Sequence, residues 1–379
     1  MKRIVFAVTN ELSYDQRMIR ICTSLARAGY SVTLVGRRWR QSTPPLPERP
    51  FKQVRLFCFF FKGKLSYIEY NLRLFFFLLF HKTDALCAID LDTIVPFYLV
   101  SKLKGLPRIY DAHELFCEMK EVVTRPLIYK IWKRVERFAV PRFKYGYTVN
   151  DAIANEFYRM YGVQYEVIRN MPVCQPLTIP DKPEKYILYQ GAVNEGRSFE
   201  TLIPAMKMVN ARLIICGEGN FMEQARKLVQ EHGLQDKVIF KGRILPQELS
   251  TYTRHAWAGV TLFENTGLNN YHSLGNRFFD YLHAGLPQVC VNYPAYREIN
   301  NQYDVAVLID DLRPETIASG LNRLLNNEAL YTAKQQNCLK ARQVFNWQEE
   351  EKKLLDFYKH ILAFGKAPTY HLIRRTLPS

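Results

Sequence analysis

Residues 271–292 read YHSLGNRFFDYLHAGLPQVCVN, and this stretch predicts a loop, a helix, a turn and a strand in succession. The loop is small and polar, with Gly275 where the chain must bend and Asn276 in a favourable N-cap position. Gly285 and Pro287 end the apolar helix, and the short run after them is typical of a buried strand. A helix that leads directly into a buried strand indicates the repeating unit of a parallel α/β sheet.

The same alternation of strand and helix runs through both halves of the chain. Between the halves, residues 169–185 read RNMPVCQPLTIPDKPEK, and the four prolines of this segment indicate a linker. We therefore expect an α/β fold with two doubly wound Rossmann-like domains and a cleft between them. Residues 1–172 form the expected N-terminal domain and residues 173–346 the C-terminal domain, and a helix and tail over 347–379 pack back on the N-terminal domain. The expected strands are residues 3–9, 31–37, 84–89, 108–114, 186–192, 211–219, 237–243 and 258–264.

The composition is that of a globular chain. Of its 379 residues, 48% are hydrophobic and 23% are charged. Its eight cysteines are scattered without a CxxC pair, which predicts core thiols in a reducing compartment rather than a zinc or disulfide framework. The most apolar run, residues 72–80, is far shorter than the roughly 20 residues of a membrane-spanning helix. The apolar run at the start, residues 4–8, is also short, so we expect a first strand there and not a secretory signal.

Positive charge is concentrated in the N-terminal half. Residues 1–180 contain 28 Lys and Arg against 15 Asp and Glu, whereas the whole chain has a net charge of +16. An excess confined to one half indicates an anionic partner for that half, which is either nucleic acid or an anionic membrane surface or phosphorylated lipid. No nucleic-acid-binding module is recognisable, so we do not expect a nucleic-acid partner.

An expected helix over residues 126–140 favours the membrane. Its cations fall at i, i+3, i+4 and i+7, and they form one basic stripe of Lys130, Lys133, Arg134 and Arg137. Such a stripe is typical of a helix that lies on a membrane surface. The alternative is an ordinary surface helix that packs its apolar side, with Ile131 and Phe138, on the sheet.

Asp280 is the single carboxylate in the aromatic helix of the opening stretch. The backbone N–H groups of residues 272–275 and the dipole of the following helix form an anion site suited to a diphosphate. A carboxylate one turn into that helix can accept hydrogen bonds from two ribose hydroxyls. The alternative is that Asp280 only complements the helix dipole. Residue chemistry alone leaves both interpretations open.

Two other short motifs are weaker. No GxGxxG follows the first strand, and the glycines of CGEGN, Gly217 and Gly219, are more typical of a tight strand–helix turn than of a nucleotide site. Asp90 and Asp92 in DLD have the spacing of an Asp-x-Asp metal motif. Their place at the end of an expected strand favours an acceptor contact or a helix cap instead.

Several motifs together resemble the retaining glycosyltransferase family 4, which has the GT-B fold. NRFFDYLHAGLP, residues 276–287, resembles the donor-site motif of one branch of that family, and NTGLNNYHSLGN, DQRMIRICTSLARAGYSVTLVGR and YDAHELF resemble other segments. The resemblance extends along nearly the whole chain. Two family Glu positions are His272 and Asp280 here, so any role of the first Glu is in doubt. A family Lys appears as Arg197, and a family Gly-Arg appears as Gly191-Ala192, which removes one of two cations.

The resemblance implies a retaining enzyme of the hexosyltransferase type that moves a sugar from a nucleotide-diphosphate sugar to a glycan or lipid-linked acceptor in cell-surface polysaccharide biosynthesis. It implies no cofactor and no metal. A cytoplasmic enzyme, peripheral on the inner face of the plasma membrane, fits the charge distribution. The alternatives are a nucleotide-sugar epimerase of similar fold and a non-catalytic homologue that acts as a membrane scaffold. The implied catalytic residues are His113, Arg197 and Glu264, and the implied donor-binding residues are Arg243, His272, Ser273, Leu274, Gly275, Asn276 and Asp280.

Overall fold

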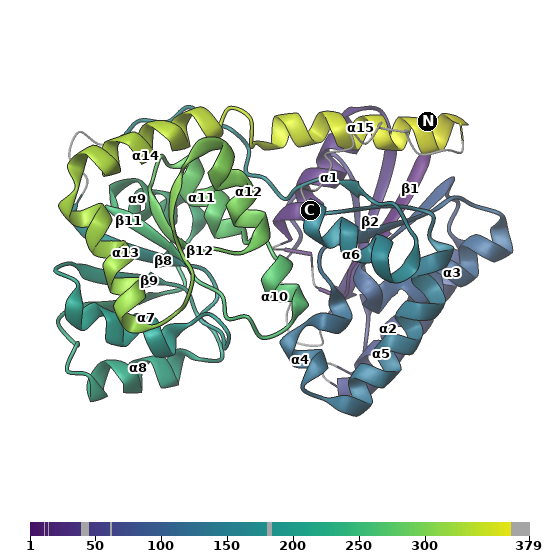
Figure 1. Ribbon diagram of the computed structural model, residues 1–379. Helices are drawn as coiled ribbons and strands as arrows, with labels where there is room; N and C mark the ends of the chain where they lie inside the picture. Colours follow the sequence, from purple (N-terminus) through teal and green to yellow (C-terminus); the bar gives the residue numbers. More distant parts are fainter. Residues whose placement is uncertain (11, 14, 39–44, 61–62, 180–183, 365–379) are drawn as a thin grey trace. The chain divides into compact units, whose positions relative to one another are not determined.

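The chain folds into two compact units (Figure 1). The structure is a computed structural model that describes residues 1–10, 12–13, 15–38, 45–60, 63–179 and 184–364. Unit 1 comprises Met1–Cys117, Thr124–Arg169 and the described residues from Glu350 onward, and unit 2 comprises Glu118–Val123 and Asn170–Glu349. The chain therefore passes from unit 1 to unit 2 at the start of the proline-containing segment, and most of its last helix belongs to unit 1.

Unit 1 is built on a seven-stranded parallel sheet in the order β3-β2-β1-β4-β5-β6-β7. The chain begins at β1, continues outward to β2 and β3, and then crosses to β4 on the other side of β1. The topological switch point therefore lies between β1 and β4, where ligands bind in open α/β sheets. The strands are β1 (Arg3–Ala7), β2 (Ser31–Arg38), β3 (Lys52–Phe57), β4 (Ala85–Ile89), β5 (Arg108–Ala112), β6 (Tyr145–Thr148) and β7 (Glu166–Val167).

Helices connect the strands of unit 1. Because crossovers are right-handed, the helices that lead to β4, β5, β6 and β7 cover one face of the sheet, and α1 covers the other. The last helix packs on unit 1 through Tyr358, whose ring lies 6.0 Å from that of Phe6 and whose hydroxyl is 3.2 Å from that of Tyr147. The helices are α1 (Gln16–Arg27), α2 (Gly63–Phe80), α3 (Asp90–Lys104), α5 (Pro126–Ala139), α6 (Asp151–Tyr161) and α15 (Trp347–Phe364).

Unit 2 contains a six-stranded parallel sheet in the order β10-β9-β8-β11-β12-β13. Its switch point lies between β8 and β11, because the chain continues from β8 to β9 and β10 and returns on the other side of β8. The strands are β8 (Tyr186–Gln190), β9 (Arg212–Cys216), β10 (Val238–Gly242), β11 (Ala258–Thr261), β12 (Gln288–Val291) and β13 (Ala306–Ile309). The helices are α4 (Lys120–Val123), α7 (Phe199–Ala205), α8 (Met222–Glu231), α9 (Pro246–His255), α10 (Leu268–His272), α11 (Asn276–His283), α12 (Pro294–Tyr303), α13 (Pro314–Asn326) and α14 (Glu328–Ala341).

The opening stretch forms α10, α11 and β12 in unit 2. Phe278, Phe279 and Leu282 of α11 are fully buried in the core of the unit, while Asp280 is half-buried. The expected N-cap is one residue too late, because Gly275 is the N-cap and no side chain caps the helix. Gly275 sits here because a side chain would collide with the Phe263 ring, only 2.8 Å from a Cβ at this position.

The expected division of α5 into a basic face and an apolar face is wrong. Lys133 points inward, with its side chain 12% exposed, and its Nζ lies 2.7 Å from Oε2 of the buried Glu136. Ile131 and Phe138, which were expected on the buried side, are instead 48% and 44% exposed. The buried Glu136 accounts for the difference, because a carboxylate removed from water requires a cation beside it. The outer face of α5 is therefore both basic and apolar.

Most of the cysteines are buried free thiols, as their scatter along the sequence predicts. All eight cysteines are free, and seven of them are buried. Burial raises the pKa of the Cys216 thiol to about 11, as is usual for a core cysteine. None of the helices that the structure describes combines the length and the apolar character needed to cross a bilayer.

Candidate functional site

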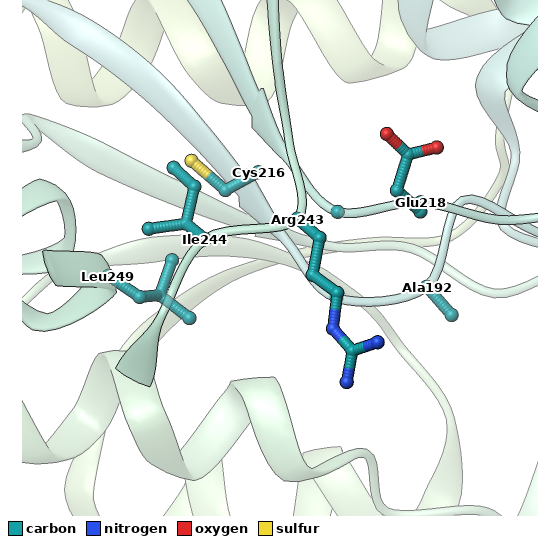
Figure 2. Close-up of a pocket in the computed structure, with 8 residues that line it drawn as sticks. Ala192, Cys216, Glu218, Arg243, Ile244 and Leu249 are labelled. Atoms are coloured by element: carbon teal, nitrogen blue, oxygen red, sulfur yellow. The ribbon is translucent and has the colours of Figure 1, made fainter. Parts of the chain in front are cut away.

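A pocket of about 360 Å³ lies at the carboxyl ends of three neighbouring strands in unit 2 (Figure 2). Each strand ends directly at the pocket, because the lining residues follow β8, β9 and β10 in the sequence. Cys216, Ile244 and Leu249 form an apolar side, while Arg243 and Glu218 supply charged groups. The remaining lining residues are Gly191, Ala192 and Gly217. Arg243, which directly follows β10, therefore lies at a pocket large enough for a small ligand.

The two glycines of CGEGN let the loops around this pocket approach one another. A Cβ at Gly217 would lie 1.8 Å from the Gly191 carbonyl oxygen, and a Cβ at Gly219 would lie 2.1 Å from that of Val193. Both distances are far below van der Waals contact, so no other residue fits at either position without moving the backbone. These glycines shape the turn, which agrees with the structural interpretation of the motif.

Asp280 extends from α11 toward the end of β8. Its Oδ2 accepts a hydrogen bond of 3.0 Å from Nε2 of Gln190, and Oε1 of Gln190 accepts one of 2.8 Å from the Thr253 hydroxyl. Gln190 is buried and precedes Gly191 of the pocket lining. These two hydrogen bonds fix the orientation of the Asp280 carboxylate near the pocket. A carboxylate that only complemented the helix dipole would not need a fixed orientation.

Two guanidinium groups gather beside the same loops. Arg277 is buried, with 8% of its surface exposed, and its guanidinium carbon lies 4.1 Å from the centroid of the Tyr189 ring. Arg197 lies over the Phe263 ring at 4.4 Å, and Arg277 is 5.4 Å from the same ring. Burial and the nearby charge of Arg277 lower the pKa of Arg197. The two cations are thus close enough to oppose each other's charge.

Neither guanidinium is neutralised by a carboxylate. Within the described part of the chain, no ion pair involves Arg197 or Arg277, and Nη1 of Arg277 and Nε of Arg197 are buried without a hydrogen-bond partner. An unpaired buried charge is costly, so proteins normally pair such groups or use them for an anionic ligand. Arg277 also lies near the pocket, because its Nη2 would be 3.6 Å from a Cβ at Gly191.

The sequence interpretation missed Arg277 as a site residue. The only signal was its position directly after the loop of the proposed anion site, where an arginine is ordinarily solvent-exposed. Its burial becomes apparent only when Tyr189 and Phe263, from two other segments, are placed around it.

The loop before α11 is partly engaged within the protein. The N–H of Gly275 donates to the Tyr296 hydroxyl at 2.8 Å, and the N–H of Ser273 donates to the Asn270 carbonyl at 3.3 Å. These two amides therefore point into the protein, which leaves less of this loop to hold an anion than the sequence indicated. Leu274 is partly buried against the core. His272 is the last residue of α10, and its ring lies 5.2 Å from that of Tyr271. Asn276 accepts a hydrogen bond from Asn170.

A backbone hydrogen bond holds Glu264 near Arg197. Its N–H donates to the Gly196 carbonyl at 3.0 Å, next to Arg197. Its carboxylate is 3.6 Å from Nζ of Lys120 in α4 and is 26% exposed, so it is accessible to a polar ligand. The residues that the structure brings together in unit 2 are therefore Arg197, Arg277, Glu264, Asp280 and the pocket with Arg243.

His113 forms a separate charged cluster in unit 1. It follows β5, and its ring nitrogens lie between two carboxylates: Nδ1 is 3.3 Å from Asp90 and Nε2 is 3.2 Å from Asp111. Its backbone N–H also donates to Asp90 at 2.9 Å. Burial lowers the pKa of His113, but the two carboxylates outweigh it and raise that pKa to about 9. The imidazole is therefore held as a cation near neutral pH.

The carboxylates around His113 are themselves supported. The buried Arg17 of α1 donates to Asp111 at 2.8 Å, and this guanidinium keeps the pKa of Asp111 low despite its burial. Burial raises the pKa of Asp90 to about 7 and that of Asp92 to about 6. Asp90 does not cap α3 with its side chain, and Asp92 accepts a hydrogen bond of 2.7 Å from Thr9. The cluster therefore occupies the carboxyl ends of β1, β4 and β5, at the switch point of unit 1.

Sequence comparison relates the second half of the chain to glycosyltransferases. Residues 177–343 match the sequence profile of the family described as glycosyl transferases group 1, and they include the pocket and both arginines. The uncharacterized glycosyltransferase MJ1607 of Methanocaldococcus jannaschii is 25% identical over 181 residues, which are 46% of this chain and 45% of the relative. The matched stretch thus spans less than half of that relative.

Structural comparison covers nearly the whole chain and confirms the predicted fold class. A sucrose-phosphate synthase from Thermosynechococcus elongatus superimposes with a TM-score of 0.79 over 96% of this chain and 100% of that chain, at 16% identity. WaaG, a glycosyltransferase involved in lipopolysaccharide biosynthesis, gives 0.72 over 96% and 100%, at 16% identity. HepE of Anabaena in complex with UDP-glucose gives 0.72 over 95% and 100%, at 12% identity. The chain has the α/β architecture of GT-B glycosyltransferases.

Proposed function

We propose that this protein is a retaining glycosyltransferase of family 4 that transfers a hexosyl group from a nucleotide-diphosphate sugar. The observation that carries the proposal is the pair of unneutralised guanidiniums, Arg197 and Arg277, beside a pocket at the carboxyl end of the unit 2 sheet. A diphosphate neutralises two such cations, and planar guanidiniums suit its oxygens. The match of this unit to group 1 glycosyltransferases and the UDP-glucose bound by HepE support the same class of ligand.

We assign each part of the donor to the residues of unit 2 whose chemistry suits it. The nucleobase occupies the pocket lined by Arg243, Ile244 and Leu249, and the ribose hydroxyls donate to Asp280. The diphosphate lies against Arg197 and Arg277. Glu264, which is partly exposed beside Arg197, accepts hydrogen bonds from hydroxyls of the transferred sugar. A uridine diphosphate sugar is the first donor to test, because the HepE structures contain UDP.

Transfer requires the bond between the anomeric carbon and the diphosphate oxygen to break as a bond to the acceptor oxygen forms. The departing oxygen gains negative charge, and preorganised cations stabilise that charge in the transition state. Retention follows if the acceptor attacks the face from which the diphosphate leaves. The acceptor proton then passes to the departing phosphate oxygen, so no dedicated base is needed. Arg197 and Arg277 carry the charge in this scheme, and it uses no metal ion or cofactor.

Unit 1 binds the acceptor in this proposal, and His113 contacts the sugar or the acceptor there. Its position at a strand end, between Asp90 and Asp111, holds the imidazole as a hydrogen-bond donor. The acceptor is a glycan or another lipid-linked acceptor in the synthesis of cell-surface polysaccharide, and the enzyme is cytoplasmic and peripheral on a membrane. The excess of 28 Lys and Arg over 15 Asp and Glu in residues 1–180 supports an anionic surface near the acceptor.

A ligand panel and a product analysis test the proposal. Thermal shift with nucleotide sugars identifies the donor, because a ligand at about 100 times its dissociation constant stabilises by roughly 2.7 kcal/mol. Nuclear magnetic resonance of the hydrolysed or transferred sugar then gives the anomeric configuration, and retention requires the donor's own configuration first. Formation of an epimeric nucleotide sugar without acceptor would establish the epimerase instead. Binding of the donor without hydrolysis or transfer to any glycan acceptor would establish a non-catalytic homologue.

A further inference from the structure

Exposed large apolar side chains are concentrated in one part of unit 1. Among the described residues, 22 large hydrophobic side chains are exposed, and 15 of them lie between Phe57 and Phe138. The described part of unit 2 has five such residues, which are scattered. Scattered apolar residues are normal on a protein surface, but a dense group of them marks an interaction site.

Helix α2 shows the feature most clearly, because it is apolar on both sides. Its exposed apolar residues recur every three or four positions and form a stripe along one side. The opposite side is buried against the unit. Such a helix has neither the polar outer face of a surface helix nor the burial of a core helix. The exposed stripe is Leu65, Ile68, Leu72, Phe76 and Phe80, at 50–80% exposure, and the buried side is Ser66, Tyr70, Leu74 and Leu78, at 0–2%.

Helices α3 and α5 extend this apolar surface. Helix α3 packs beside α2 and α5 packs beside α3, in the layer that covers one face of the sheet (Figure 1). Val95, Leu99 and Leu103 of α3 are spaced by four residues and are exposed. The exposed residues of α5 include Leu127 and Phe138. Because the sheet-facing sides of the three helices are buried, their exposed stripes share the outer side of one layer. We call this surface, formed by the exposed residues of α2, α3 and α5, the outer helical face.

The charges on the outer helical face have one sign. All four carboxylates of the three helices, Glu69, Asp90, Asp92 and Glu136, are buried or half-buried. Their other charged residues are cations, and five of these eight are exposed. The outer helical face therefore presents apolar stripes among cations with no fully exposed carboxylate. The exposed cations are Lys64, Lys102, Lys130, Arg134 and Arg137.

We propose that the outer helical face docks on a bilayer that contains anionic lipids. The apolar stripes enter the interfacial region, and the long cationic side chains reach the phosphate groups around them. A second copy of the chain fits this face less well, because a two-fold contact would place each cationic patch against its own copy. The inference extends the proposed function by assigning the surface through which the enzyme reaches a membrane-bound acceptor. Docking itself does not depend on the identity of the donor.

Sedimentation with lipid vesicles tests the docking surface. We compare vesicles of phosphatidylcholine alone with vesicles that contain phosphatidylglycerol, at low and high salt. Binding should require the anionic lipid and should weaken with salt, because such attraction is screened over roughly 8 Å at physiological ionic strength. The triple variant Ile68→Gln, Leu72→Gln, Phe76→Gln and the triple variant Lys130→Gln, Arg134→Gln, Arg137→Gln should each reduce bound protein at least 10-fold.

Matched controls come from unit 2. Val173→Gln, Met208→Gln, Val344→Gln removes exposed apolar residues, and Lys207→Gln, Arg212→Gln, Lys227→Gln removes exposed cations, so both should bind like the parent. Donor hydrolysis in solution, measured on every variant, separates loss of docking from loss of folding or of the proposed chemistry. Equal binding to both kinds of vesicle, unchanged binding of either unit 1 variant, or light scattering that shows a dimer dispersed by the apolar variant would each overturn the proposal.

Discussion

Arg197 and Arg277 lie against one aromatic ring. Their guanidinium carbons are 4.4 Å and 5.4 Å from the centroid of Phe263, and no carboxylate in the described part of the chain pairs with either. In a folded protein without ligand this arrangement is unfavourable, because two like charges are desolvated together. Such a pair is preorganised for an anion, since binding removes the repulsion without moving the cations. Affinity for the anion and stability of the free protein should therefore change in opposite directions when one cation is removed.

Arg277→Gln should weaken UDP binding about 10- to 100-fold, because hydrogen bonds to charged groups contribute roughly 1.5–3 kcal/mol. The melting temperature of the free variant should stay the same or rise, because an unpaired buried charge is lost. Calorimetric titration with UDP and with uridine checks both effects, and uridine affinity should not change. Arg226→Gln, which removes an exposed guanidinium stacked on Phe240, is the matched control. A lower melting temperature with unchanged UDP affinity would assign Arg277 a purely structural role.

Arg197→Ala should reduce the rate of transfer more than it reduces donor affinity. Removing one charge-stabilising group in a transition state typically costs on the order of 10² in rate. Arg197 is less buried than Arg277 and lies beside Glu264, so the proposed donor pose places it nearer to the transferred sugar. Steady-state kinetics with donor and acceptor separates kcat from KM. Near-normal kcat in the variant would show that Arg277 or another group stabilises the leaving diphosphate.

Asp280→Asn should weaken UDP binding about 10-fold while the fold is retained. Asn at this position can still accept a hydrogen bond from Gln190 but lacks the negative charge that favours two hydroxyl donors. The parent protein should also prefer UDP to 2′-deoxy-UDP, and the variant should lose that preference. Asp236→Asn, on the exposed surface of the same unit, serves as the control. An undiminished preference for the ribonucleotide would mean that another residue binds the ribose.

Much of the fold could be predicted because its signals are local. Strands β1, β4 and β8 are short apolar runs, and helix ends coincide with glycines such as Gly29 and Gly105, which adopt positive φ. Helix α2 was not predicted as a helix, because apolar residues around its whole circumference give no amphipathic pattern. The physical cause is the same exposed stripe that sets α2 apart in the folded unit.

The candidate site was less predictable, because burial and pairing depend on residues distant in sequence. Arg277 and Lys133 both have the sequence context of exposed cations. Arg277 is enclosed by aromatic rings from other segments, and Lys133 is drawn inward by Glu136. Strand-end positions were more informative, because a parallel sheet brings the residues after its strands to the same edge of that sheet. His113 follows a strand of unit 1, and Arg243 and Glu264 follow strands of unit 2.

His113 should make the stability of the protein depend on pH. Its pKa is raised to about 9 by Asp90 and Asp111, against the opposing effect of burial. A folded-state pKa above the usual value near 6.5 means that this interaction stabilises the protein fully below that pH. The stabilisation is lost as the pH rises through about 9. Asp90→Asn removes one of the two carboxylates, so the pKa of His113 should fall and the stabilisation should be lost at lower pH.

Titration of the imidazole signals by nuclear magnetic resonance checks this directly. His283 is an internal reference with the opposite behaviour, because burial lowers its pKa. Asp84→Asn, which removes a carboxylate paired with Arg3 elsewhere in unit 1, should leave the His113 titration unchanged. If Asp90→Asn left it unchanged as well, Asp111 alone would hold the proton on His113, and Asp90 would serve only to receive the His113 backbone N–H.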